Sequence, residues 1–359
     1  MPKISIRNAD ISDIPGILEL VRIIGRYVSF EDELFSWMAL DPQAVVIAES
    51  SQPKQIVGAC SGMAYGPGRG FMGLYMVREE YRGLGIGSQL WNKAMKHLEG
   101  RNIGVRGKEF MFSEYRDKRG FVHQPNYVMC FYKCSESSLV LPKLNIDGLG
   151  IVSLTGKGVW PRKPELMANI QDVKSSLAQN TSEYALKDMT ISYLDTVENI
   201  IVQEWKDTTK YRTSVENLLT EVVNYDRLLH GYDRSFIVAQ TLSWRSCKTK
   251  IAIINEKVVG YICLRPTVVG FWMISPFYAD SEDIAELLLV SLLSDVNFSE
   301  ITDGIQIRVP DKNPYCLKLI QKYGFRDQNL RISTGYNKSC IDIDVSRFYS
   351  FHSTIFCTE

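Results

Sequence analysis

The sequence predicts a mixed α/β fold of the α+β class, arranged as two domains. The chain has 359 residues, and a single domain usually has about 100–200. Segments that alternate apolar and polar residues, as strands do, are interleaved with segments in which apolar residues recur at helical spacing. A sequence pattern of the first half, at residues 73–77, also recurs in the second half, at residues 270–274. The composition, with 45% hydrophobic and 23% charged residues, is that of a globular protein.

The first predicted elements are a strand and two helices. Ile4 and Ile6 alternate with polar residues, which predicts a short strand. A helix is expected next, with Ser12 as its cap and Pro15 in its first turn. Residues 30–40 have the pattern of a second helix, which Asp41-Pro42 would end.

The remaining elements of the first half alternate between strands and helices. Strands are predicted at 44–48, 56–65, 71–77 and 103–106. One helix is predicted to begin near residue 87 or 88, and another to span 108–118. The strand at 71–77 leads into a loop with three alternating glycines, Gly83, Gly85 and Gly87. Glycine lets a ligand approach the backbone closely, and the first N–H groups of a helix have no partner within it. This arrangement predicts a site for phosphate oxygens at the helix start.

The spacing of the loop residues narrows the choice of phosphate ligand. No lysine lies in the loop, which argues against the Walker pattern. The dinucleotide fingerprint would place a glycine at position 88, where serine stands. The pattern that remains is Arg-x-x-Gly-x-Gly at Arg82, Gly85 and Gly87. It resembles the pyrophosphate loop of the GNAT superfamily of acyl-CoA-dependent N-acetyltransferases.

The resemblance extends over the order of elements around the loop. In that family the helix is followed by a strand, a second helix and a Gly-Phe pair, which here is Gly120-Phe121. The resemblance implies a mostly antiparallel central sheet flanked by helices, with acetyl-CoA as co-substrate and no metal. The residues it assigns to cofactor binding are Tyr75, Met76, Val77, Arg82, Gly83, Leu84, Gly85, Ile86, Gly87 and Ser88.

The second half of the chain resembles a second, degenerate GNAT-like domain. Residues 73–77 align without gaps to 270–274, and this alignment places Arg82 on Ala279, Gly85 on Glu282 and Gly87 on Ile284, and Leu90 on Leu287. Carboxylates at that helix start would repel a pyrophosphate. We therefore expect an N-terminal acetyltransferase domain at 1–135 with the acetyl-CoA site, a linker region at 136–185, and a degenerate domain at 186–359 that is structural or shapes the acceptor site.

Family chemistry implies direct attack of a free amine on the thioester, without an acyl-enzyme. A tyrosine four residues before the Gly-Phe glycine often protonates the leaving thiolate. Here that position is Arg116, and the tyrosine, Tyr115, stands one residue earlier. Tyr115 is the candidate general acid. No base is evident: the acidic run 31–33 could serve as base or as amine-recognising charge, and Glu109, Glu114 or a water chain are alternatives.

Charge and cysteine usage restrict the partners. Lys+Arg and Asp+Glu are 41 each, so no global positive field favours nucleic acid or an anionic membrane. The eight cysteines show no metal or disulfide spacing, which favours a reducing, cytoplasmic location. Two functions follow: an acetyl-CoA-dependent N-acetyltransferase acting on a primary amine, with a small molecule favoured over a protein tail, or a non-catalytic acyl-CoA-binding or regulatory module.

Overall fold

The computed structural model describes residues 3–25, 31–139, 141, 150–158, 200–203, 215–353 and 355–357. The first half contains the elements β1 Ile4–Asn8, α1 Ile14–Ile24, α2 Glu31–Leu40, β2 Val45–Ser51, β3 Lys54–Tyr65, β4 Arg69–Val77, α3 Ile86–His97, β5 Asn102–Lys108, α4 Glu109–Arg119 and β6 Met129–Cys134. The second contains β7 Gly150–Gly156, β8 Ile200–Gln203, α7 Val215–His230, α8 Ser235–Ser243, β9 Lys248–Ile254, β10 Lys257–Pro266, β11 Trp272–Ala279, α9 Glu282–Ser294, β12 Ile305–Pro310, α10 Pro314–Lys322, β13 Arg326–Tyr336 and β14 Phe348–Ser350.

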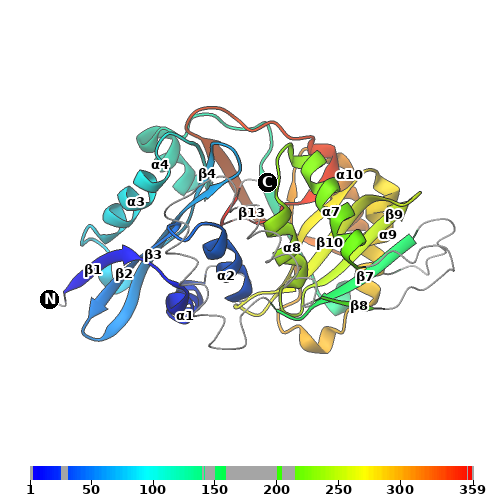
Figure 1. The fold of residues 1–359 in the computed structure, drawn as a ribbon, viewed down its shortest axis with the longest axis horizontal. Coiled ribbons are helices and arrows are strands. Elements are labelled where there is room, and N and C mark those ends of the chain that lie inside the picture. The colour runs from blue at the N-terminus through cyan, green and yellow to red at the C-terminus, as the bar shows by residue number, and fades with distance from the viewer. Residues whose placement is uncertain are drawn as a thin grey trace.

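One continuous sheet runs through both halves (Figure 1). Its strand order is β1-β2-β3-β4-β5-β13-β6-β12-β11-β10-β9-β7-β8, and β14 pairs with β11 off this path. Among the described strand pairs, only β4–β5 and β11–β12 are parallel. The predicted mostly antiparallel sheet is therefore confirmed, and each half contains one parallel pair.

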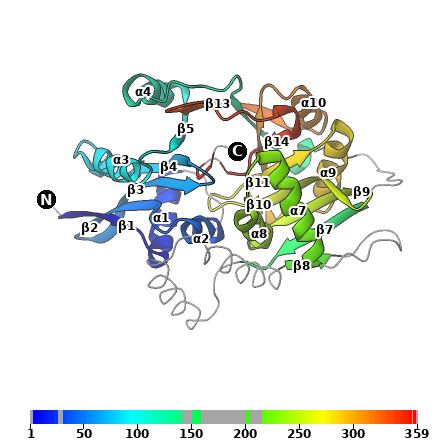
Figure 2. The same ribbon diagram turned by 45° about the horizontal axis from the view of Figure 1, so that its top comes forward.

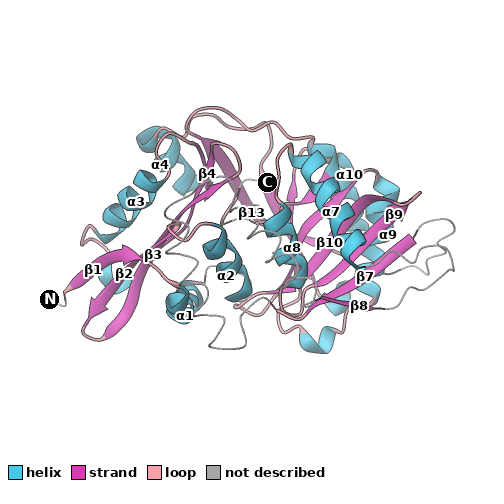
Figure 3. Ribbon diagram, in the orientation of Figure 1, coloured by secondary structure: helices cyan, strands magenta, loops and turns pink. Residues whose placement is uncertain are grey.

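Helices cover both faces of the sheet (Figures 2 and 3). In the first half, α1 and α2 pack on one face with the side chains of Phe71, Leu74 and Met76, and α3 and α4 pack on the other. In the second half, α7 and α8 cover one face, and α9 and α10 cover the other. The two halves thus repeat one arrangement of layers, as the sequence predicts.

The two halves exchange a strand where they meet. Strand β13 follows Gly324-Phe325 in the second half, yet it lies between β5 and β6 of the first. Strand β6 follows Gly120-Phe121 in the first half and lies against β12 of the second, with Ile307 opposite Tyr132. Each half therefore completes the sheet of the other. Without the strand from the other half, each half of the sheet would end at a strand edge whose backbone groups are unpaired.

Several local expectations need correction. Asp10, rather than Ser12, caps the first turn: its carboxylate accepts from the Ser12 N–H at 2.7 Å, and α1 follows from Ile14. Helix α3 begins at Ile86, just before the expected start. Within the predicted linker region, Gly150–Gly156 forms β7, which pairs with β9 of the second half. Most of the rest of that region, 142–149 and 159–185, lies outside the described residues.

Candidate functional site

Strands β4 and β5 separate partway along their length. They pair in parallel only over 69–72 and 102–105. Beyond that point β4 continues beside β3 as far as Val77, and β5 continues beside β13 as far as Lys108. We call the separation of the two strands after Met72 and Val105 the first split. No described strand pairs with the β4 edge that faces the first split at Tyr75 to Val77, so this edge has no neighbouring strand on that side.

A β-bulge lies at the start of the first split. The register between β3 and β4 shifts between Ala59 and Ser61, and Leu74 has a φ of +46°. A non-glycine residue in this region is uncommon and is held there by its surroundings. A bulge bends its strand and redirects the backbone groups that follow it. Here it turns the segment from Tyr75 to Val77 away from β5.

The glycine loop ends at the uncapped start of α3. Gly85 is the N-cap residue with a φ of +72°, and no described side chain bonds the first N–H groups of the helix. Gly83 also has a positive φ, +79°, and both glycines face open space. Glycine is needed at these positions because L side chains rarely adopt this conformation. The helix start therefore presents unengaged N–H groups to an anion.

The structure brings the ten predicted cofactor residues together at this end of β4. The side chains of Met76 and Ile86 point into the core, so only their backbone can meet a ligand. Arg82 is exposed, and its Nε donates to the carbonyl of Val77 at 3.3 Å. The other residues of the loop that are exposed are Gly83, Leu84, Gly85 and Ser88.

Tyr75 belongs to an aromatic cluster between β4, α3 and α4. Its ring lies edge-on to Trp91 at 5.5 Å, and Trp91 stacks on Tyr115 at 5.4 Å. The guanidinium of Arg119 lies 5.1 Å above the Trp91 ring. A Cβ built on Gly87 would collide with the Tyr75 hydroxyl, so a larger residue there would require the Tyr75 side chain to shift. Trp91 and Arg119 are parts of this site that sequence reasoning missed; the position of Trp91 within the motif helix was the available signal.

Burial raises the pKa of the Tyr75 phenol, with a smaller contribution from Cys60, while the nearby Arg119 opposes the shift. The hydroxyl therefore stays protonated at neutral pH and can donate a hydrogen bond. Tyr115 is buried on α4, with its ring against Trp91 and Gly107 of β5. Arg116, which holds the family position of the proton donor, instead pairs with Asp117 on the surface. Of the two residues, Tyr115 is the one that faces the split strands.

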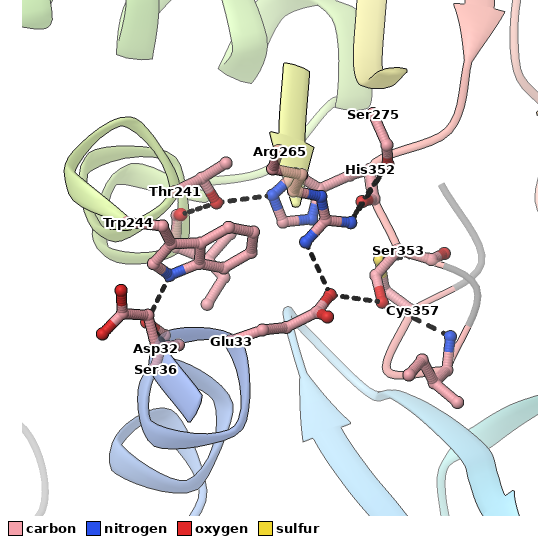
Figure 4. A network of polar contacts seen from close by, with 12 residues as sticks. Asp32, Glu33, Ser36, Thr241, Trp244, Arg265, Ser275, His352, Ser353 and Cys357 are labelled. Carbon is pink, nitrogen blue, oxygen red and sulfur yellow. Dashed lines mark hydrogen bonds and ion pairs between the residues drawn. The ribbon is translucent and has the colours of Figure 1, made fainter. Parts of the chain in front are cut away.

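The acidic run at the start of α2 does not lie open to an acceptor (Figure 4). Glu33 is 1% exposed and pairs with Arg265 of the second half at 2.8 Å. Asp32 accepts from the backbone N–H of Arg245 at 2.5 Å. Glu31, at the edge, lies 3.4 Å from the Arg245 guanidinium. These carboxylates hold α2 against the second half, and this engagement argues against a role for Glu33 as a general base.

The second half has an equivalent split, and the chain itself fills it. Strands β11 and β12 pair over 272–274 and 305–307 and then separate, which defines the second split. Strand β14 pairs there with β11, placing Ser350 opposite Phe277 and Phe348 opposite Tyr278. Asn313 fixes this segment by donating to the carbonyl of Phe348 at 3.0 Å.

Matching backbone pairs relate the two splits and correct the alignment. Gly58 lies opposite Val77, and Gly260 lies opposite Ala279. Val77 therefore matches Ala279, whereas the gap-free alignment places Val77 five residues earlier, on Ile274. A Cβ on either glycine would meet a leucine of the following helix at 3.0 Å, Leu90 or Leu288. Tyr75 and Met76 thus correspond to Phe277 and Tyr278, the residues that pair with β14.

The loop of the second half that corresponds to the glycine loop is therefore shorter. Between Val77 and Ile86 the chain has eight residues, 78–85, and between the equivalent Ala279 and Ile284 it has four, 280–283. The predicted placements of Arg82 on Ala279, Gly85 on Glu282, Gly87 on Ile284 and Leu90 on Leu287 are wrong, because they assumed loops of equal length. Helix α9 also begins with Glu282 and Asp283 and is capped by the Ser281 side chain, which accepts from Ile284 N–H.

Comparison with known families supports this arrangement. Residues 18–108 match the model of the acetyltransferase (GNAT) family, and residues 222–350 match that of an acetyltransferase (GNAT) domain. The chain belongs to the GNAT superfamily. It is a tandem GNAT protein, and its family membership supports acyl-CoA-dependent acetyl transfer in general.

Two solved structures share the fold of this tandem GNAT protein rather than much of its sequence. A candidate acetyltransferase of Pyrococcus horikoshii superposes with a TM-score of 0.63 at 14% identity, over 99% of this chain and 96% of that one. A tandem GNAT protein from the clavulanic acid biosynthesis pathway has a TM-score of 0.56 at 13% identity, over 94% and 100%. An uncharacterized Caenorhabditis elegans protein is 34% identical over 87 residues, which are 23% of this chain and 27% of the relative.

Two further observations concern the described residues as a whole. None of the helices that the structure describes is long and apolar enough to cross a membrane. No group of three or more His, Cys, Asp or Glu side chains in the described part of the chain is arranged to hold a metal ion.

Proposed function

We propose that the first domain is an N-acetyltransferase that transfers the acetyl group of acetyl-CoA to a primary amine of a small acceptor. The observation that carries this proposal is the contrast between the two splits. The first has a glycine loop, an uncapped helix start and an open β4 edge at Tyr75 to Val77. The second has a shorter loop, a capped helix and β14 on the equivalent edge. Only the first can accept the carrier.

The residues of the first split fit acetyl-CoA, which would supply an acetyl group activated as a thioester. The N–H groups near Gly87 and the Arg82 guanidinium would hold the pyrophosphate. The backbone of Tyr75 to Val77 would pair with the pantetheine arm as a strand would, and its N–H groups would polarise the thioester carbonyl. Tyr115 would protonate the leaving thiolate, and Tyr75 would donate a hydrogen bond at the helix start.

Calorimetric titration of the intact chain with CoA tests the site. The substitution Gly85→Asp places a carboxylate where the phosphates would lie, and we expect binding to be lost. Gly100→Asp is the matched control, because Gly100 also has a positive φ (+83°) and open space around it but lies outside the site. Equal CoA affinity in the wild type and Gly85→Asp would contradict the proposed location.

A thiol-release assay with acetyl-CoA and a panel of small amines, amino acids, amino sugars and peptides tests catalysis. Acetylation of a peptide terminus alone would overturn the small-acceptor part of the proposal. Replacement of Tyr115 by Phe should lower the maximal rate and change its pH profile while CoA affinity is kept, since the ring packing on Trp91 is preserved. An unchanged pH profile would remove Tyr115 as the proton donor.

The alternative is a non-catalytic acyl-CoA-binding module. The burial of Tyr115 under Trp91 and the engagement of Glu33 in an ion pair favour it. This alternative requires CoA binding that is sensitive to Gly85→Asp together with no thiol release for any amine in the panel. Failure to bind CoA would exclude both functions.

A further inference from the structure

A segment of the second domain crosses the first split at its first open position. Gly73 and Arg106 are the residues that directly follow the last β4–β5 pair, Met72 with Val105. A Cβ built on Gly73 would collide with the carbonyl oxygen of Ile355. On the other strand, Arg106 Nη1 donates to the carbonyls of Ser353 at 2.8 Å and Cys357 at 3.1 Å. We call residues 353 and 355–357 the closing segment.

The closing segment is firmly packed. Ser353, Phe356 and Cys357 are each at most 1% exposed. The Phe356 ring stacks on Trp37 of α2 at 5.6 Å, and the Ser353 hydroxyl lies 3.4 Å from Glu33 (Figure 4). The part that meets β4 is a backbone carbonyl against a glycine, so no side chain can rotate aside to make room. This end of the first split therefore has a rigid wall.

The same run of chain closes both splits, to different extents. In the second split, Ser275 directly follows the last pair, and its hydroxyl donates to the carbonyls of Phe351 at 2.5 Å and His352 at 2.6 Å. There β14 also covers the next positions, Phe277 and Tyr278. In the first split the described residues of the closing segment meet β4 at Gly73. No described strand pairs with the equivalent edge at Tyr75 to Val77.

The direction of the bound carrier follows from these positions, and this step rests on the proposed function. With the pyrophosphate at the start of α3, beside Val77, the arm must run along β4 from Val77 toward Gly73. Its acyl end then points to the closed end of the first split. The length of acyl group that fits is set by the distance left before the closing segment.

We propose that the closing segment, held by Arg106, limits the acyl group to short chains. We expect short acyl groups such as acetyl to fit, whereas medium and long acyl chains would meet the Ile355 carbonyl. Arg106 is a positioning residue in this proposal, since it acts through the segment whose two carbonyls it binds. Acyl-chain selectivity in the first domain is therefore supplied by the second domain.

Competitive binding to the intact chain tests the proposal without knowledge of the acceptor. The probes are CoA, acetyl-CoA, butyryl-CoA and octanoyl-CoA. We expect the wild type to bind octanoyl-CoA at least about tenfold more weakly than acetyl-CoA, a difference of about 1.4 kcal/mol. Arg106→Ala should bring the two affinities within about threefold by releasing the segment. Arg101→Ala is the matched control, because its guanidinium donates to the Arg69 carbonyl at 3.2 Å, outside the closing segment.

A second variant keeps the test decisive if Arg106→Ala does not fold. Phe356→Leu retains an apolar side chain but removes the stacking on Trp37, and it should shift the preference in the same direction. Equal affinity of the wild type for acetyl-CoA and octanoyl-CoA would overturn the proposal by itself. So would a folded Arg106→Ala variant with unchanged selectivity. Failure of CoA itself to bind would instead contradict the proposed function, so the two failures are distinguishable.

Discussion

The ion pair between Glu33 and Arg265 is expected to make a large contribution to the docking of the two halves. Both side chains are 1% exposed, and the Nη1 and Oε1 atoms lie 2.8 Å apart. Arg265 Nη2 also donates to the His352 carbonyl at 2.9 Å and to the Ser275 hydroxyl at 3.2 Å, and its guanidinium lies 4.7 Å above Trp244. The pair thus connects α2 to β10, β11 and the segment after β14.

Replacement of Arg265 by Met should lower the free energy of unfolding by about 3–5 kcal/mol, because it leaves the Glu33 carboxylate buried without its counter-charge. This is about a fifth or more of the roughly 5–15 kcal/mol that stabilises a typical protein. Glu33→Met should cost less, since the guanidinium keeps its bonds to His352 and Ser275. The double variant should be more stable than Arg265→Met, because an apolar pair can replace a buried ion pair.

Urea unfolding followed by tryptophan fluorescence measures these differences, since Trp37 and Trp244 lie at the junction. The control is the exposed pair of Glu114 and Lys118 on α4, whose side chains are 54% and 68% exposed. Lys118→Ala should cost no more than about 0.5 kcal/mol. If Arg265→Met also stays within about 0.5 kcal/mol of the wild type, the buried pair does not support the junction and the reasoning fails.

Three further predictions concern acid stability, strand exchange and thiol exposure. The hydrogen bond from Arg331 holds the pKa of Asp327 below its ordinary value of 3.8, so this stabilisation is present at neutral pH and is lost as the pH falls through the lowered pKa. The Asp327→Asn variant should therefore lose less stability on acidification than the wild type, by at most about 1 kcal/mol, because the pair is partly exposed. Urea midpoints at neutral and at acidic pH measure this difference, and equal losses in the two proteins would contradict the prediction. A fragment of residues 1–139 should fail to fold, since β13 is missing between β5 and β6; a native-like circular dichroism spectrum with cooperative melting would disprove this. Of the eight cysteines, only Cys340 is exposed, so a thiol reagent should modify about one thiol quickly in the native protein and all eight in denaturant; rapid native modification of several would show that the packing differs.

The sequence predicts the geometry of the glycine loop well because the requirement there is local. A positive φ at Gly85 and an uncapped helix start depend on a few neighbouring residues, and the motif records them. The exchange of β6 and β13 is not predictable in this way. Each strand follows a Gly-Phe pair, and nothing in either segment specifies which sheet it enters. The choice is made by contacts between residues about 200 positions apart in the sequence, such as Ile332 opposite Met129.

The incorrect alignment of the loop at 280–283 in the second half has a different cause. An alignment without gaps preserves the apolar pattern of strand and helix, but it cannot register a loop that is shortened between them. The strand pairing reveals the shortened loop, because Gly260 lies opposite Ala279 as Gly58 lies opposite Val77. Strand β14 was missed because it is three residues long, and such a segment carries almost no periodic signal. Its position depends on Asn313, which lies far from it in the sequence.

The two splits together indicate how the second domain, whose loop is shorter, would contribute to the proposed function of the first. Separated parallel strands leave backbone groups without partners, and these groups must be satisfied by a ligand, by solvent or by the chain itself. The second domain satisfies them with β14, so it needs no carrier to complete its sheet. The residues that follow β14 then extend to Gly73 and Arg106 of the first domain. Filling one split with the chain's own strand thereby supplies the wall of the other, and the proposed acyl selectivity of the first domain depends on that wall.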